Sequence, residues 1–201
     1  MGKIDEKKKQ KQKRLLDSAF KLFTTKGFQN TSISDIARKA SMAKGTFYLY
    51  FKDKYVIRDH LISIQADNLF KDAEQALLQT DITDFTDQII FILNYIVDEF
   101  SKNKVLLTFI SKNLSWGVFK DALTHPSTED ELNFQTIYQQ MIAQTPDEFE
   151  NPEVMLFMII ELVGGCCPNV MLSNEPVSIE EFKPLLYQAV RSIIEGQKKK
   201  K

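Results

Sequence analysis

Apolar residues recur three or four positions apart near the start of this chain, the spacing that is typical of amphipathic helices. The first apolar stripe lies in residues 15–23, and Gly27 follows it as a residue that commonly ends a helix. A second, shorter stripe covers residues 33–40. Ser32 precedes it, and Asp35 stands three positions later, as in a capping box. The pattern therefore predicts two consecutive helices.

Helical spacing continues along the remainder of the chain, and no stretch alternates with period two for long enough to indicate a strand. Asn151-Pro152 and Ser178-x-x-Glu181 are typical helix starts. Only 7 of the 201 residues are glycine, which disfavours turn-rich β folds and glycine-rich phosphate loops. The sequence predicts an all-α fold of about nine helices. The further helical patterns cover residues 43–51, 53–79, 82–102, 104–113, 129–144, 152–172 and 179–197.

The longest nearly uninterrupted apolar run, residues 154–163, is shorter than the 18 or so residues that a membrane span requires, so it predicts a buried helix. The charged residues 1–7 do not resemble a secretory signal. Cys166 and Cys167 are adjacent and cannot join distant segments, which favours a reducing compartment. We expect a cytoplasmic protein without a membrane partner.

The net charge of −1 conceals a strong asymmetry. Residues 1–54 carry 14 Lys/Arg against 5 Asp/Glu, a local charge of +9, and the remainder carries −10. A basic segment on an acidic body is typical of a module that binds a polyanion, joined to a part with another task. The alternative is a solvated basic arm without a partner.

Two short helices joined by a turn of three or four residues form a helix-turn-helix, whose second helix enters the major groove of DNA. Phe47 and Phe51 lie one turn apart in the second segment and are expected to pack inward. Lys44 could reach guanine acceptors, and Gly45 allows the backbone to approach the duplex. Tyr48 fits either the core or the DNA surface.

Hydroxyl and ammonium groups nearby suit phosphate oxygens, which position a protein on DNA without specifying sequence. Thr46, Tyr50 and Lys54 have such groups, and Thr31 and Ser32 stand at a helix N-terminus that can accommodate a phosphate. The candidate DNA contacts are Thr31, Ser32, Lys44, Gly45, Thr46, Tyr48, Tyr50 and Lys54.

These residues belong to a dense, ordered series of motifs that resembles the DNA-binding head of the TetR repressor family. The series comprises residues 15–23, Lys26-Gly27-Phe28, residues 31–37 and residues 44–54. The resemblance implies an all-helical homodimer whose first three helices bind operator DNA and whose fourth joins them to a ligand-sensing, dimerising body. It also implies that Lys44, Gly45 and Tyr48 contact bases and that Thr46, Tyr50 and Lys54 contact phosphates.

Three positions depart from the family pattern. Ser41 replaces a glycine that is frequent in the turn, and Ala43 replaces a capping serine. Tyr50 replaces a frequent histidine, which retains a phosphate donor and removes pH sensitivity at that position. The resemblance predicts a DNA-binding domain over residues 9–69, with its helix-turn-helix at 32–51, and a ligand-binding and dimerisation domain over residues 70–201.

The body carries no motif that identifies a ligand. The resemblance implies a pocket lined by aromatic and apolar residues, although such residues at helical spacing more often form core. Glu161 interrupts an apolar run, so it is either hydrogen-bonded, at a dimer edge, or in contact with a cationic ligand. Cys166 and Cys167 fit either buried inert thiols or an oxidant sensor. The pocket candidates are Phe70, Tyr95, Phe109, Trp116, Tyr138, Met141 and Glu161.

The last two helical patterns resemble the four-helix dimer interface of the family, and the final one carries an apolar stripe too wide to leave in water. That stripe comprises Ile179, Phe182, Leu186, Ala189, Val190 and Ile193. Pro168 and Pro184 are expected to kink these two helices.

Other function classes find little support in the sequence. Nucleotide-binding glycine patterns, hydrolase motifs and paired Cys-x-x-Cys motifs are absent, so we expect neither an enzyme nor a cofactor. His60 and His125 are isolated, which disfavours a metal site. The sequence predicts a homodimeric repressor that a small hydrophobic effector releases from a palindromic DNA operator. The alternative is a DNA-binding regulator without an inducer, controlled by a partner protein or by abundance.

Overall fold

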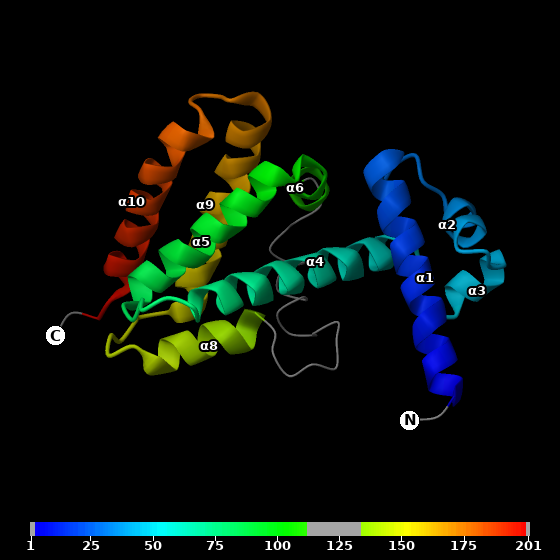
Figure 1. The fold of residues 1–201 in the computed structure, drawn as a ribbon, viewed down its shortest axis with the longest axis horizontal. Helices are drawn as coiled ribbons and strands as arrows, with labels where there is room; N and C mark the ends of the chain where they lie inside the picture. The colour runs from blue at the N-terminus through cyan, green and yellow to red at the C-terminus, as the bar shows by residue number, and fades with distance from the viewer. Residues whose placement is uncertain (1–2, 112–133, 200–201) are drawn as a thin grey trace. The chain divides into compact units, whose positions relative to one another are not determined.

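The computed structural model describes residues 3–111 and 134–199, and in these ranges the chain forms nine helices (Figure 1). The only β pairing there is an isolated bridge between Phe149 and Lys198. The predicted all-α class is confirmed. The chain divides into two compact units, residues 1–64 and 65–201. This division and the boundary expected at residues 69/70 both fall within α4 (Lys54–Leu77).

The first unit contains α1 (Lys3–Thr25), α2 (Ile33–Lys39), α3 (Lys44–Tyr48) and the start of α4. Helix α2 packs against both α1 and α3. Leu15, Ile36 and Phe47 are fully buried and form the centre of this unit, and Phe51 is also buried. The predicted inward orientation of Phe47 and Phe51 is confirmed.

Local signals explain where these helices begin and end. Gly27 adopts a positive φ of 86° after the end of α1, a conformation that glycine adopts without a steric penalty. The hydroxyl of Ser32 accepts from the backbone N–H of Asp35, whose carboxylate accepts from the Ser32 N–H, so the capping box is present. Helix α1 begins well before the first predicted apolar stripe because its Lys- and Gln-rich start favours helix.

The second unit contains the remainder of α4 and five further described helices. Helix α5 packs against α6 and α10, while α9 packs against α6 and α10. Asp84, Asn151 and Ser178 cap α5, α9 and α10, so both predicted start signals in the later part of the chain are confirmed. The five helices are α5 (Phe85–Lys102), α6 (Lys104–Ser111), α8 (Phe134–Gln144), α9 (Pro152–Ser173) and α10 (Ile179–Gln197).

Helix α9 is the one described helix whose length and composition would allow it to cross a membrane. In the structure it packs against α6 and α10, and a helix that is apolar on all sides is typical of a core as well as of a membrane. Six of its side chains are buried, in agreement with the predicted core helix: Met155, Leu156, Ile159, Cys167, Val170 and Met171. Pro168 lies inside α9 and Pro184 inside α10, and both helices continue past them.

The apolar stripe of α10 packs at least in part against the core of its own unit, and its assignment to a dimer interface stays a prediction. Leu186 and Val190 are buried within a single chain, at 1% and 0% exposure. Ile179, Phe182 and Ile193 are partly buried against the same core. The spacing correctly predicted an apolar face, but the helices of the same unit cover it. Ala189, of intermediate burial, also belongs to the predicted stripe.

Candidate functional site

The turn between α2 and α3 closes through backbone hydrogen bonds. The N–H of Met42 donates to the Ala37 carbonyl at 2.9 Å, and that of Ser41 donates to Arg38 at 3.0 Å. Ser41 has a φ of 55°, in the left-handed region where glycine is favoured. The turn therefore keeps the backbone conformation that a glycine would adopt there, despite the departure from the family pattern.

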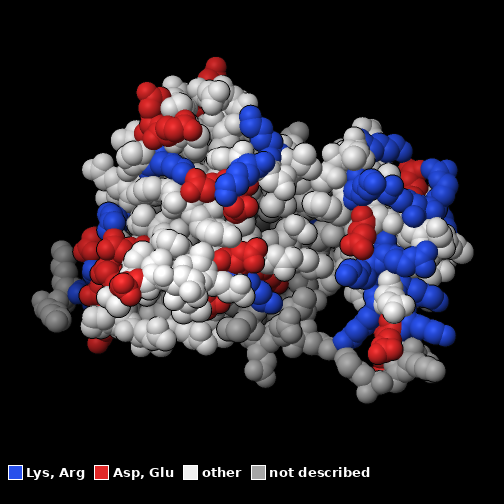
Figure 2. All heavy atoms as spheres, in the orientation of Figure 1, with Lys and Arg blue, Asp and Glu red and all other residues white. Residues whose placement is uncertain are grey.

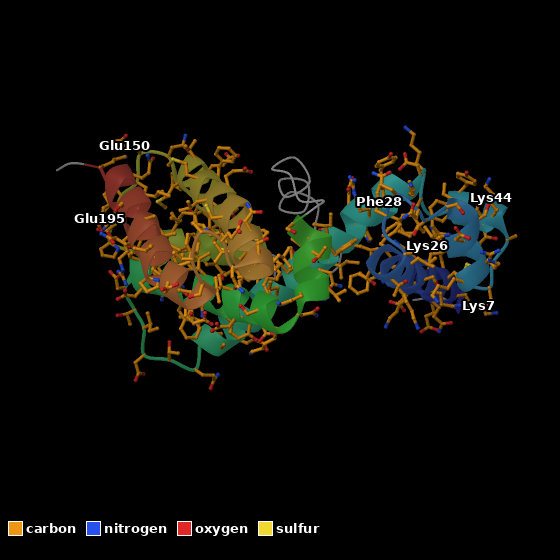
Figure 3. All side chains as sticks on the ribbon, turned by 90° about the horizontal axis from the view of Figure 1, so that it is seen from above. Lys7, Lys26, Phe28, Lys44, Glu150 and Glu195 are labelled. Carbon is orange, nitrogen blue, oxygen red and sulfur yellow. The ribbon has the colours of Figure 1, made fainter. Side chains whose placement is uncertain are left out.

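Helix α3 presents an open surface. Lys44 and Gly45 are exposed, and a Cβ at Gly45 would have no neighbour within 4 Å. In Figure 3 the Lys44 side chain lies at the outer edge of the first unit. Tyr48 is 50% exposed and packs edge-on against Phe47, which favours the surface over the core for Tyr48. Leu49, which no sequence signal selected, is 78% exposed beside it.

The other candidate DNA contacts in and just after α3 are less exposed to solvent than Lys44, Gly45 and Tyr48. Thr46 and Tyr50 are of intermediate exposure, so both can still present a hydroxyl to a phosphate. Ala43 precedes α3 without a side-chain cap, as the sequence indicated.

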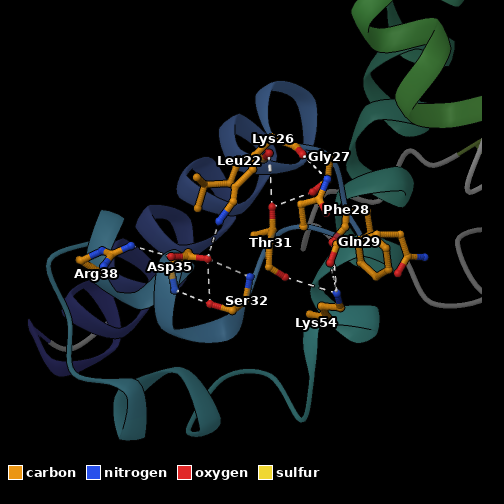
Figure 4. Close-up of polar contacts among 11 residues, drawn as sticks. Leu22, Lys26, Gly27, Phe28, Gln29, Thr31, Ser32, Asp35, Arg38 and Lys54 are labelled. Atoms are coloured by element: carbon orange, nitrogen blue, oxygen red, sulfur yellow. Dashed lines mark hydrogen bonds and ion pairs between the residues drawn. The ribbon is translucent and has the colours of Figure 1, made fainter.

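Thr31 and Ser32 differ in what their hydroxyls do (Figure 4). Thr31 is buried, and its hydroxyl donates to the Gly27 carbonyl at 2.8 Å, so in this structure its side chain cannot contact a phosphate. The Ser32 hydroxyl is exposed but donates to the Asp35 carboxylate at 2.8 Å while capping α2. The sequence correctly placed both residues at the helix start and could not show that Thr31 turns inward.

The Asp35 carboxylate binds two basic side chains of the first unit, the DNA-binding head. That carboxylate accepts from Lys26 at 3.0 Å and from Arg38 at 2.6 Å, in addition to Ser32. The hydrogen bond from Lys26, followed by those from Ser32, holds the pKa of Asp35 well below its usual range. These contacts connect the end of α1 to the start of α2.

Lys54 is bound to the protein backbone at its head group. Its ammonium donates to the carbonyls of Phe28 at 3.1 Å, Thr31 at 3.3 Å and Gln29 at 3.4 Å (Figure 4). It also lies 4.6 Å from the ring centroid of Phe28. In this structure Lys54 therefore holds the loop between α1 and α2 against the start of α4. The phosphate contact expected from the sequence stays a prediction.

Basic side chains dominate the first unit on the face that Figure 2 shows, whereas both signs are mixed over the second. Residues 7–14 of α1 contribute six Lys or Arg, and all six are exposed. Arg14 also donates to the Ala40 carbonyl in the turn. The first unit therefore combines a helix-turn-helix with a basic surface, as a polyanion-binding module requires.

The second unit contains an apolar cavity of about 300 Å³. Phe70 and Glu161, both selected from the sequence, contribute to its wall. The other lining residues were missed because apolar residues at helical spacing resemble ordinary core. They are Ala66, Leu69, Leu93, Ile96, Phe100, Leu107, Ile110, Ser111, Ile160, Val163, Gly164, Gly165, Cys167 and Pro168.

The other pocket candidates do not line this cavity. Phe109, Tyr138 and Met141 are buried, and Tyr95 is partly buried against the core. The Tyr138 hydroxyl donates to the Pro152 carbonyl at 2.8 Å, and burial raises its pKa. These four are therefore core residues in this structure, while Trp116 lies outside the described residues.

Burial shifts the pKa values of one cysteine and one histidine among the described residues. Burial raises the pKa of the Cys167 thiol to about 12, which favours the unreactive protonated form. Cys166 is half-buried. Residues 3–111 and 134–199 hold no cluster of three metal-ligating side chains. Burial lowers the pKa of His60, and His125 lies outside the described residues.

A polar cluster that the sequence did not reveal joins α5 to α10. Lys183 donates to Asn94 at 3.1 Å and forms an ion pair with Asp98. The Tyr187 hydroxyl donates to Asn94 at 2.7 Å. Burial, followed by the nearby Asp98 charge, raises the pKa of Tyr187 to about 12. The cluster joins two parts of the chain that are some 90 positions apart, so no local sequence pattern could have predicted these contacts.

Comparison with known proteins identifies the first unit. Residues 15–61 match the family model described as bacterial regulatory proteins, tetR family. The HTH-type transcriptional regulator YvkB of Bacillus subtilis is 24% identical over 180 residues, which cover 86% of this chain and 90% of YvkB. YuxN of the same organism, also named an HTH-type transcriptional regulator, is 36% identical over 62 residues, or 31% of this chain and only 21% of YuxN.

A solved structure shares the fold of both units. The transcriptional regulator FadR from Bacillus subtilis, in complex with stearoyl-CoA, aligns with a TM-score of 0.63 and 14% identity. The alignment covers 88% of this chain and 96% of FadR. At this identity the likeness extends to the fold alone.

Proposed function

Because the chain belongs to the tetR family of bacterial regulatory proteins and is a DNA-binding transcriptional regulator rather than an enzyme, we propose that it is a ligand-released repressor. A homodimer would occupy a palindromic operator, and a small apolar molecule would lower its affinity for that operator. The observation that carries the proposal is the helix-turn-helix of α2 and α3, with Lys44, Gly45 and Tyr48 exposed on the second helix. Its site of action is the cytoplasm.

Sequence recognition would come from α3 in the major groove of each half-site. Lys44 would contact guanine acceptors, while Thr46 and Tyr50 would contact phosphates. The basic residues 7–14 are helical and exposed, so they would add phosphate contacts beside the groove.

Dimerisation would use the exposed faces of α9 and α10, since their inward faces already form core. Three large apolar side chains on these helices are 43–58% exposed: Val154, Leu172 and Leu185. Exposed apolar groups of this size on neighbouring helices favour burial against a second copy.

Ligand release would use the cavity of the second unit. Helix α4 is continuous from Lys54, which binds the loop after α1, to Leu69 and Phe70, which line the cavity. A displacement of this helix by a ligand would therefore act on the head. A coupling of about 1–3 kcal/mol between the two sites would change operator affinity about 5- to 150-fold. The FadR structure with stearoyl-CoA supports a ligand site in this fold.

The test is selection of duplexes from a randomised pool by the full chain, followed by affinity measurements with the selected sequence. Lys44→Ala should relax base preference at one position in each half-site, at a cost of about 1–3 kcal/mol. Lys104→Ala, an exposed lysine of α6, serves as the charge-matched control and should leave the preference unchanged. Equal losses on selected and random duplexes would remove Lys44 as a base reader.

A further inference from the structure

Leu49 is the most exposed large apolar side chain in the part of the chain that the structure describes, at 78%. It follows α3 directly, and its backbone remains helical, with φ of −74° and ψ of −17°. Its N–H donates to the Thr46 carbonyl at 3.2 Å, so the last turn of the helix fixes the position of Leu49. A single exposed leucine is ordinary on a protein surface, so its place on the helix decides what it can contact.

Leu49 lies on the outermost face of this short segment. One residue corresponds to about 100° around a helix, so two residues correspond to about 200°. Phe47, two positions before Leu49, is fully buried, and Phe51, two positions after it, is 4% exposed. Leu49 therefore points away from the core, and Gly45, one turn earlier, lies on the same outer face. A Cβ at Gly45 would have no neighbour within 4 Å, so this face is open.

The outer face of α3 is short enough to lie entirely within a major groove. The helix contains five residues and is about 7.5 Å long, whereas the major groove is about 12 Å wide. Gly45 and Leu49 can therefore lie inside the groove at the same time. Because Gly45 has no side chain, the backbone can approach the bases and bring the leucine one turn further along close to their edges.

The leucine side chain cannot form a hydrogen bond, so it can distinguish bases only by apolar contact. In the major groove, the apolar group that marks a base is the C5-methyl group of thymine. Lys44 and Lys52, which precede and follow Leu49 in the sequence, are exposed and carry positive charge suited to phosphates. An apolar side chain between cations thus matches a groove in which a methyl group lies between two phosphate backbones.

We propose that Leu49 is a specificity-determining residue that contacts the methyl group of one thymine in each half-site. This inference rests on the proposed function, in which α3 enters the major groove, and it names one base that the operator contains. Loss of one buried methyl group changes affinity about fourfold for each half-site, and about 16-fold when both half-sites change. Lys44 contacts guanine acceptors in the same account, so its contribution concerns another base pair.

The test replaces each thymine of the selected operator by deoxyuridine, which pairs with adenine in the same way and lacks only the methyl group. Binding of the full chain to each duplex is measured by fluorescence anisotropy at one salt concentration. One such replacement in each half-site should weaken the wild-type protein about fourfold. Leu49→Ala should bind the thymine and deoxyuridine duplexes equally. Leu49→Met stays apolar and should keep a preference for thymine.

Leu78→Ala is the matched control, because Leu78 is 71% exposed and lies in the second unit. It should retain the full fourfold effect, and melting temperatures are measured to show that the variants are folded. The inference is overturned if Leu49→Ala keeps the deoxyuridine effect or weakens selected and random duplexes alike, which would assign Leu49 to a backbone contact. Unchanged binding of Leu49→Ala to every duplex would also overturn it and would leave Leu49 for contact with another protein.

These outcomes are separate from those that test the proposed function. A selected operator whose affinity is independent of every thymine methyl group would retain the DNA-binding repressor and remove this inference. Failure of the wild-type chain to select any sequence would remove both.

Discussion

The ammonium of Lys54 lies 3.1 Å from the backbone carbonyl oxygen of Phe28, which fastens the first turn of α4 to the loop that follows α1. The same group reaches the carbonyls of Gln29 and Thr31 and the ring of Phe28. Arg58, one turn further along α4, lies 5.0 Å from that ring. The loop before the helix-turn-helix thus takes its position from the start of the helix that enters the second unit.

Replacement of Lys54 by methionine removes the donor while keeping most of the apolar stem. Three carbonyls then lose a charged partner, so the head should lose about 1–3 kcal/mol of stability. Urea unfolding, with NMR signals of α1 and α2 as the local readout, measures the loss. Unchanged stability together with a lower salt dependence of DNA binding would instead make Lys54 a phosphate contact, as the sequence suggested.

The uncapped start of α3 provides a gain-of-stability test. Ala43 has the extended backbone of an N-cap, with φ of −68° and ψ of 147°, but no side chain that can accept a hydrogen bond. Ala43→Ser should therefore stabilise the head by about 0.5–2 kcal/mol. Thermal unfolding of the two proteins under the same conditions measures the gain. No gain would mean that a backbone N–H of α3 is already satisfied in solution.

Adjacent leucines on α10 separate folding from dimerisation. Leu186 is 1% exposed and Leu185 58% exposed. Leu186→Asp buries a charge in the core and should cost more than about 4 kcal/mol, which unfolds the second unit. Leu185→Asp should keep the helical circular dichroism and shift the sedimenting species from dimer to monomer. A folded monomer from Leu186→Asp would instead support the assignment of this stripe to the dimer interface.

Acid should weaken the head through Asp35. Its pKa is lowered in the folded state, so it contributes stability above its unfolded pKa of about 3.9, and this contribution is lost as the pH falls below that value. At neutral pH, Asp35→Asn should destabilise α2, and the difference from wild type should shrink as the pH falls below about 4. NMR-detected unfolding at pH 7 and pH 3 tests this. A difference independent of pH would assign the effect to lost hydrogen bonds alone.

The sequence predicted the helices well because their signals are local. The bounds of α10 agree with the predicted range 179–197, since the Ser178–Glu181 capping box depends on neighbours along the chain. Gly27 was likewise predictable from residue type, whereas the turn before α3 adopts its left-handed conformation at Ser41, where no glycine indicates it. The candidate DNA contacts on α3 could also be predicted from the sequence. Phe47 and Phe51 pack inward, and their spacing determines which positions of this short segment face outward.

The features that the sequence did not predict depend on contacts between segments that are distant along the chain. Periodicity shows that Leu186 lies on an apolar face, but not that the same chain covers that face. Tyr138 in the core and Phe70 in the cavity wall are both aromatic residues at helical spacing. Only the packing of neighbouring helices determines which of the two borders an empty volume. The three carbonyls that bind Lys54 are similarly invisible in the sequence.

The central claim is that a ligand in the second unit and an operator on the first oppose each other. The most direct measurement is the affinity of the ligand that most raises the melting temperature, determined without and with saturating selected operator duplex. Linkage requires operator to weaken ligand binding by the same factor by which ligand weakens operator binding, about 5- to 150-fold for a coupling of 1–3 kcal/mol. The account predicts that loss. Identical ligand affinities in the two conditions would contradict it and would favour a regulator controlled by a partner protein or by abundance.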